Sequence, residues 1–185
     1  PPVPNGQNGW YVSDVMVTLN ATDNDSGVWR TFCNLSPGGN YTGPILVSQD
    51  GIYEITFYSI DYAGNVEATK SVWIKIDKTP PKVIMDWDWE QVGSVINIIV
   101  TATCTDEMSS ISKVEFYFND ELQETVTGAG PDYVWTYQYT PLQNVEIKGI
   151  AYDNCGLNDF ATLINPTSTA NQQSSQQSHT TVLMK

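Results

Sequence analysis

Val17-Thr18-Leu19-Asn20-Ala21-Thr22-Asp23 recurs later in the chain as Val100-Thr101-Ala102-Thr103-Cys104-Thr105-Asp106. A second repeat follows, because Glu54–Asp61 runs into Tyr62-Ala63-Gly64-Asn65 and Glu146–Asp153 runs into Asn154-Cys155-Gly156. Each half therefore has one strand ending at Thr-Asp and a later strand ending at an aspartate before a glycine-containing turn. In a seven-strand sandwich these are strands B and F, whose following loops meet at one pole.

The rest of the chain has almost no helical periodicity. Short alternating or β-branched runs are instead separated by Gly, Pro, Asn and Asp, which is typical of an all-β sandwich or barrel. The sequence therefore predicts an all-β fold made of two tandem immunoglobulin-like β-sandwiches. The runs are Val15–Leu19, Tyr53–Ile60, Ser71–Ile76, Val95–Thr103, Lys113–Phe118, Val134–Tyr139 and Val145–Ala151.

The break between the two halves is expected at Asp77-Lys78-Thr79-Pro80-Pro81. A double proline cannot donate hydrogen bonds to a strand ladder, and it stiffens an extended connection. The predicted domains are residues 1–78 and 79–185, and each is near the size of an immunoglobulin-like sandwich.

The end of the second domain has two interpretations. In the first, Phe160–Ile164 closes the sandwich and the Ser/Gln-rich stretch Thr167–Ser178 is a flexible linker. In the second, which we favour, Thr180–Met184 is the last strand and residues 157–178 form a long insertion before it.

Several segments resemble the Ig-like repeats of bacterial and archaeal proteins. In the first half these are Tyr41-Thr42-Gly43-Pro44, Asp50-Gly51-Ile52-Tyr53 and Tyr58-Ser59-Ile60-Asp61-Tyr62-Ala63-Gly64-Asn65-Val66-Glu67. In the second half, Ile111-Ser112-Lys113-Val114-Glu115-Phe116-Tyr117-Phe118 is similar to a related module. Such repeats occur on cell-surface proteins and as appendages of secreted hydrolases, so the resemblance implies an extracellular or surface location. It is weak evidence for function, because these modules serve as spacers, adhesins and binding domains alike.

Composition excludes several classes of function. The formal net charge is −13, with only eight basic residues, which argues against a nucleic-acid partner and an anionic membrane surface. No apolar run approaches the length of a membrane helix, so no direct insertion is expected. A start at Pro1 without methionine indicates a piece of a longer chain, whose neighbouring domains are expected partners. The single histidine, His179, lies beside the Ser/Gln stretch, so the chain is not expected to be an enzyme.

Cys104 ends the predicted strand B and Cys155 follows the predicted strand F, at the same pole. A disulfide between them is therefore predicted. Cys33 has no partner and is expected to be a buried thiol.

Acidic residues also gather where the repeat brings loops together. Calcium binds six to eight carboxylate, amide and carbonyl oxygens, so these loops are candidate calcium sites, although Asp and Asn before Gly are also ordinary turn formers. No other cofactor is expected. The candidate ligands are Asp23, Asp25, Asp61, Asn65, Asp106, Glu107 and Asp153.

Trp87 and Trp89 alternate with acids in Met85-Asp86-Trp87-Asp88-Trp89-Glu90. On a strand they share one face and are candidates for stacking on sugars, although strand alternation also favours their burial. Four Asn-x-Ser/Thr sequons, at Asn20, Asn24, Asn34 and Asn40, are candidate glycosylation sites.

The sequence thus predicts a non-catalytic extracellular tandem acting in adhesion or as a structural spacer, with a surface glycan or a host protein as possible partners. Two alternatives stay open: a carbohydrate-binding accessory module of a secreted hydrolase, and a calcium-stiffened surface repeat.

Overall fold

The structure is a computed structural model, and it describes residues 2–128, 130–138 and 145–164. The described residues form β-strands and one short 3-10 helix, η1 (Pro37–Gly39), so the predicted all-β fold is confirmed. No helix among them is long and apolar enough to cross a membrane. The chain divides into two compact units, unit 1 (Pro1–Thr79) and unit 2 (Pro80–Lys185).

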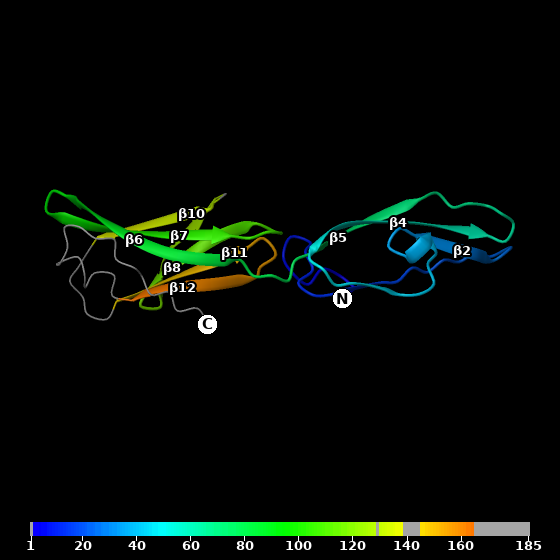
Figure 1. Ribbon diagram of the computed structural model, residues 1–185, viewed down its shortest axis with the longest axis horizontal. Helices are drawn as coiled ribbons and strands as arrows, with labels where there is room; N and C mark the ends of the chain where they lie inside the picture. Colours follow the sequence, from blue (N-terminus) through cyan, green and yellow to red (C-terminus); the bar gives the residue numbers. More distant parts are fainter. Residues whose placement is uncertain (1, 129, 139–144, 165–185) are drawn as a thin grey trace. The chain divides into compact units, whose positions relative to one another are not determined.

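Unit 1 contains two antiparallel sheets. The smaller pairs β1 (Val15–Val17) with β3 (Ile45–Val47), and the larger has the order β2-β4-β5. The strands of the larger sheet, seen side by side in Figure 1, are β2 (Val28–Cys33), β4 (Gly51–Asp61) and β5 (Lys70–Ile76).

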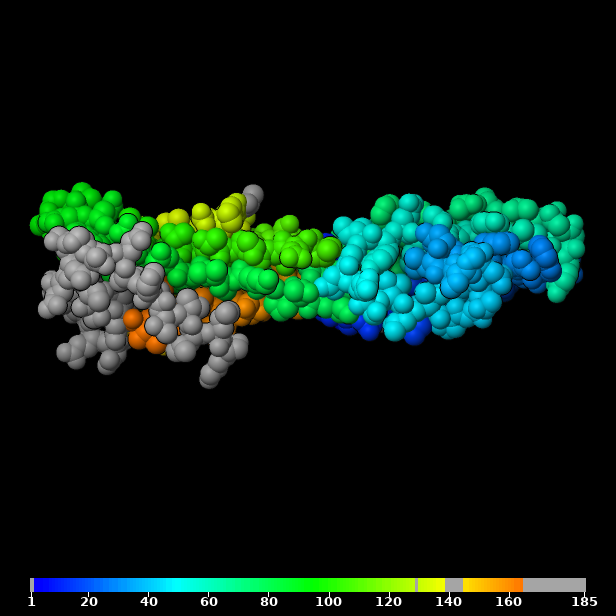
Figure 2. All heavy atoms as spheres, viewed as in Figure 1, coloured from blue at the N-terminus to red at the C-terminus, as the bar shows by residue number. Residues whose placement is uncertain are grey.

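Alternation along these strands builds one small core between the two sheets of unit 1. Ile55 on β4 and Ile76 on β5 are fully buried, while their neighbours along the strand point outward. The blue to teal atoms of Figure 2 show unit 1 packed as one continuous body. The core cluster is made of Val15, Val17, Cys33, Val47, Ile55, Ile74 and Ile76.

Unit 2 is a β-sandwich of a three-stranded and a four-stranded antiparallel sheet. The strand orders are β10-β7-β6 and β12-β11-β8-β9. The strands are β6 (Lys82–Val92), β7 (Val95–Thr105), β8 (Ile111–Phe118), β9 (Glu121–Thr127), β10 (Asp132–Gln138), β11 (Glu146–Asp153) and β12 (Asn158–Ile164).

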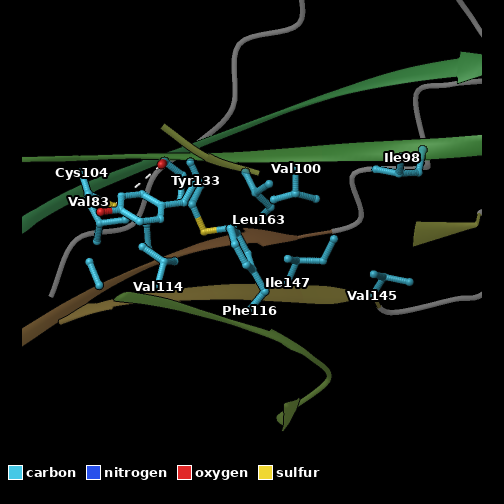
Figure 3. Packing of buried hydrophobic residues seen from close by; sticks show 14 residues of the cluster. Val83, Ile98, Val100, Cys104, Val114, Phe116, Tyr133, Val145, Ile147 and Leu163 are labelled. Atoms are coloured by element: carbon cyan, nitrogen blue, oxygen red, sulfur yellow. Dashed lines mark hydrogen bonds between the residues drawn. The ribbon is translucent and has the colours of Figure 1, made fainter. Parts of the chain in front are cut away.

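Inward side chains from both sheets of unit 2 form its larger core. Val100 on β7, Phe116 on β8 and Leu163 on β12 converge between the layers, as Figure 3 shows. The Phe116 ring stacks on Trp135 of β10 at a centroid distance of 5.9 Å, which joins the two sheets through aromatic contact.

The predicted insertion at residues 157–178 is wrong in its first part. Asn158–Ile164 forms β12, which pairs with β11 from Tyr152↔Asn158 to Glu146↔Ile164. Ala161 and Leu163 on this strand are buried, so β12 contributes directly to the core. The first interpretation, in which Phe160–Ile164 is the strand that closes the sandwich, therefore agrees with the observed β12. The predicted last strand Thr180–Met184 and His179 lie outside the described residues.

Candidate functional site

The loop after the first repeated segment of unit 1 is held by Asp23. Its Oδ1 accepts hydrogen bonds from the backbone N–H of Asp25 at 3.1 Å and of Gly27 at 2.7 Å. Gly27 has φ +80°, a left-handed conformation that glycine adopts without steric cost. The carboxylate therefore satisfies two backbone donors of its own loop.

The turn that follows β4 is held by Asp61. Its Oδ1 accepts from the Asn65 backbone N–H and its Oδ2 from the Asn65 side-chain amide, each at 2.7 Å. The N–H of Tyr62 donates to the carbonyl of Gly27 at 3.0 Å, which ties this turn to the Asp23 loop. The side-chain hydrogen bond from Asn65 lowers the pKa of Asp61 below its usual value.

The same arrangement recurs in unit 2. Asp106 Oδ1 accepts from the backbone N–H of Met108 at 3.1 Å and of Ser110 at 2.6 Å, and Ser110 has φ +66°. The backbone N–H of Asn154 donates to the Ser110 carbonyl at 2.9 Å. Asp153 Oδ1 accepts three backbone N–H groups, from Cys155 at 2.9 Å, Gly156 at 2.7 Å and Leu157 at 2.9 Å.

We call these pairs the aspartate clasps: Asp23 with Asp61 in unit 1, and Asp106 with Asp153 in unit 2. In both units the loop aspartate accepts from the second and fourth residues after it, and the turn aspartate accepts from the fourth. The sequence repeat thus encodes a repeated hydrogen-bond pattern at the same loops. One oxygen of each of these four carboxylates is already used by the backbone.

The predicted calcium ligands are therefore brought together in pairs, and four of them are clasp residues. Asp25 and Glu107 are exposed and do not belong to the clasps. Within the described part of either unit taken by itself, no three acidic, Cys or His side chains gather closely enough to hold an ion. Calcium binding at these loops stays a prediction.

Replacing Asn65 with Ala removes the donor that stabilises the ionised Asp61. We expect the pKa of Asp61 to rise toward its usual value, measured by an NMR titration of its carboxyl carbon. In the native protein this pKa is lower in the folded than in the unfolded state, so the contribution of Asp61 to stability is present above the unfolded pKa and is lost as pH falls through the folded one. An Asp61 titration unchanged by Asn65→Ala would contradict the clasp.

An open groove of about 580 Å³ lies beside the clasp of unit 1. Asn20, Asp23, Asp61 and Asn65 line it on the loop side. Its wall includes Thr31 and Ser59, whose hydroxyl oxygens are 3.0 Å apart. Hydroxyl, amide and carboxylate side chains make up much of the lining, so the groove is partly polar.

The predicted disulfide is wrong, because Cys104 and Cys155 are separate buried thiols. Cys104 lies on β7 opposite Val83, and its Sγ donates to the Ala102 carbonyl at 3.8 Å (Figure 3). Cys155 lies in the clasp turn, where its thiol interacts with Asp153 and Ser109. The two sulfurs therefore have different neighbours, although β7 and β11 end at the same pole of the sandwich. Cys33, as expected, is also a buried thiol.

Burial raises the pKa of both Cys104 and Cys155 to about 12. We expect the folded chain to resist iodoacetamide at pH 8, since thiolate is the reactive form. Denatured without reductant, the chain should yield three reactive thiols, whereas a Cys104–Cys155 bridge would leave one. Because these pKa values are higher in the folded state, the stability contributed by the two thiols should fall as pH rises from about 9 toward 12.

Trp87 and Trp89 share one face of β6, as predicted, but their environments differ. Trp87 is half-buried against the core of unit 2, whereas Trp89 is 44% exposed. Asp86 and Asp88, which alternate with the two tryptophans along the strand, are exposed. The pair therefore does not form a flat exposed platform, and its binding of carbohydrate stays a prediction.

The four sequons lie on loops and strand ends of unit 1. Asn20, Asn24 and Asn34 are exposed, and Asn40 is half-buried. The Asn34 side chain is engaged, because its Nδ2 donates to the Glu54 carbonyl at 2.8 Å and its Oδ1 accepts from the Thr56 N–H at 3.0 Å. Use of these sequons stays a prediction.

Sequence reasoning missed the aromatic residues on the outer side of the sheet β2-β4-β5. Trp73 is 61% exposed and Trp29 is 49% exposed. A signal was present at Trp73, because it is out of phase with the apolar Ile74 and Ile76 that follow on the same strand and so occupies an outward position. We define the outer aromatic face as Trp29, Arg30, Phe32, Tyr58 and Trp73.

A family model described as a bacterial Ig domain matches residues 90–182, which is half of the chain. The chain belongs to this family. The match confirms the resemblance to Ig-like repeats, and it falls within the second compact unit of this bacterial Ig-domain chain. Modules of this kind are commonly extracellular and are typically non-catalytic.

Among solved structures, this Ig-domain chain is similar to one titled "Structures of Clostridium thermocellum CbhA fibronectin(III)-like modules". The sequences are 18% identical, the match covers 96% of this chain and 97% of that chain, and the TM-score is 0.38. These values are too low to transfer a property from that protein. The comparison with curated proteins gives no match.

Proposed function

We propose that the chain is a non-catalytic extracellular pair of tandem Ig-like sandwiches, with domains at residues 1–78 and 79–185, that acts in adhesion or as a structural spacer. The observation that carries this proposal is the repeated pair of aspartate clasps. Each clasp locks one loop to one turn within its own unit, and each unit also has its own apolar core. Such modules are suited to carry a binding surface at a fixed distance from neighbouring domains of a longer chain.

Single-molecule stretching of the full chain tests the spacer part of this proposal. Two modules with separate cores are expected to give two unfolding events, because each sandwich loses its packing cooperatively. A single event that releases both units together, or extension without a resolved event, would contradict the proposal. The same experiment on a clasp variant such as Asp106→Ala is expected to weaken only one of the two events.

A binding screen tests the adhesion part. The intact chain is presented to arrays of surface glycans and of host proteins, with and without calcium. Any glycan that is bound should remain uncleaved, and the absence of released reducing sugar is the measurement for the non-catalytic part. Release of sugar by the purified chain would contradict that part directly.

The accessory-module alternative, in which the chain binds carbohydrate for a secreted hydrolase, is favoured by one specific observation. Trp29 and Trp73 are exposed on the same sheet of unit 1. Exposed tryptophans of this kind can stack on sugar rings, so a carbohydrate is also a candidate ligand for the adhesive role.

A further inference from the structure

The outer aromatic face is set by the strand alternation of unit 1. Ile55 on β4 and Ile74 on β5 point into the core, so the residues in the opposite phase point away from it. Tyr58 pairs with Phe32 across β4 and β2, and Trp73 pairs with Glu54 across β5 and β4. Aromatic side chains from all three strands therefore lie on one side of one sheet.

The rings at the β2 end of this face are fixed by contacts with one another. Phe32 and Tyr58 stack with centroids 4.8 Å apart and planes 14° from parallel. The Arg30 guanidinium lies 4.7 Å from the Trp29 ring centroid and 5.9 Å from that of Phe32. These contacts hold the aromatic groups in place before a ligand binds, which lowers the entropy lost on binding.

Arg30 is the one arginine in the sequence. No carboxylate of the described residues lies within ion-pair distance of it. Its N–H groups form a rigid fork of donors beside the Trp29 ring. Such a fork is suited to the hydroxyl oxygens of a ligand that stacks on the neighbouring ring.

The length of the outer aromatic face indicates an extended ligand. Trp73 lies opposite Glu54 and Arg30 lies opposite Ile60, so the two positions are separated by six residues along β4. At about 3.3 Å per residue this corresponds to roughly 20 Å. A single small molecule does not span that distance, whereas several linked units of a polymer do.

The charge on this face decides which polymer fits. Arg30 and Lys75 point outward from the sheet together with the carboxylate of Glu54, and the Lys75 ammonium donates to the Asn8 carbonyl at 2.8 Å, so the face carries only a small positive charge. The whole chain carries a net charge of −13 and repels polyanions. An uncharged polymer is therefore favoured over an acidic one.

Uncharged polysaccharides combine the two required properties. The C–H faces of a pyranose ring are apolar and stack on aromatic rings, and its hydroxyl groups bond to polar side chains at the margin. Thr56 and Ser71 pair with each other between Trp73 and Tyr58, and they supply hydroxyls at that position. We propose that the outer aromatic face binds an extended, uncharged polysaccharide, with Trp73 and Trp29 stacking on separate sugar units.

This inference rests on the proposed function, because it supplies the ligand of the adhesive module. It is tested by affinity electrophoresis of the full chain in native gels that contain mixed-linkage β-glucan, xyloglucan, galactomannan or polygalacturonate. We expect retardation by at least one of the three uncharged polymers and none by polygalacturonate. The variants Trp73→Ala and Trp29→Ala should each lower the association constant about tenfold or more, as is usual for a tryptophan at the centre of an interface.

Trp89→Ala is the matched control, because it removes a comparably exposed tryptophan from unit 2. It should leave the retardation unchanged, and Trp73→Phe, which keeps a ring, should retain most of it. Near-UV circular dichroism verifies folding, and Trp73→Thr, a residue that favours strands, replaces the alanine variant if that variant does not fold.

Three results would overturn the inference: no retardation by any uncharged polymer, retardation only by polygalacturonate, or equal loss of binding in Trp89→Ala. If binding is absent while the two unfolding events persist under force, the ligand assignment fails and the spacer role stands. If the two events are also absent, the proposed function itself fails.

Discussion

Replacement of Asp153 by Ala is expected to destabilise unit 2 by about 3 kcal/mol, since a buried backbone donor left without an acceptor costs roughly 1–3 kcal/mol and each of the two partly buried donors adds a smaller loss. Asp153 is 1% exposed, and its Oδ1 accepts hydrogen bonds from three consecutive backbone N–H groups. An alanine side chain supplies no oxygen, and the buried position limits access of water to these donors. The result should appear in calorimetry as a melting transition lowered by more than about 10 °C.

Two variants separate the clasp from a general effect of lost charge. Asp153→Asn keeps an oxygen at the acceptor position and should lose much less stability than Asp153→Ala. Asp88→Ala removes an exposed aspartate whose Oδ1 accepts from the N–H of the next residue, Trp89, and should change stability by no more than about 0.5 kcal/mol. Equal losses in Asp153→Ala and Asp88→Ala would show that the clasp does not stabilise unit 2.

Replacement of Ile55 by Ala should destabilise unit 1 by about 2–5 kcal/mol, the usual range for truncating a buried isoleucine. Ile55 is fully buried at the centre of β4, in a core with few other buried side chains. A domain of this size has a total stability of roughly 4–12 kcal/mol, so the variant removes a large fraction of it. Calorimetry of the full chain should show one transition moved to lower temperature and the other unchanged.

Ile52 provides the matched control on the same strand. It is 55% exposed and lies in the outward phase, opposite Lys75. Ile52→Ala should therefore leave both transitions nearly in place. If Ile55→Ala shifts both transitions equally, the two units do not unfold separately and the two-module proposal is wrong.

The repeat in the sequence predicted which residues would meet, but it did not determine what their side chains would do. Thr-Asp at one strand end and Asp before a glycine turn correctly brought Asp106 beside the Asp153 turn. The use of their oxygens depends on the backbone of the following residues, above all on the left-handed conformation of Gly27 and Ser110. A serine in that conformation is not evident from composition or spacing.

The errors have similarly local causes. Both cysteines follow or end strands at one pole, but that placement does not fix the direction of the Cβ atoms on which a disulfide depends. The strand at Asn158–Ile164 was assigned to an insertion because the Ser/Gln-rich stretch after it obscured where the sandwich ends. Trp73 was not singled out from the sequence, although the alternation of its own strand places it outward, where it is 61% exposed.

Hydrogen exchange of the full chain, followed by mass spectrometry in the native protein and in Ile55→Ala, tests the central claim that two Ig-like modules fold as separate units. The account predicts that the variant loses amide protection across β1 to β5 while peptides from β6 to β12 keep their native exchange rates. Equal loss of protection in β7, β8 and β11 would contradict it, because the chain would then be one cooperative body rather than a pair of modules.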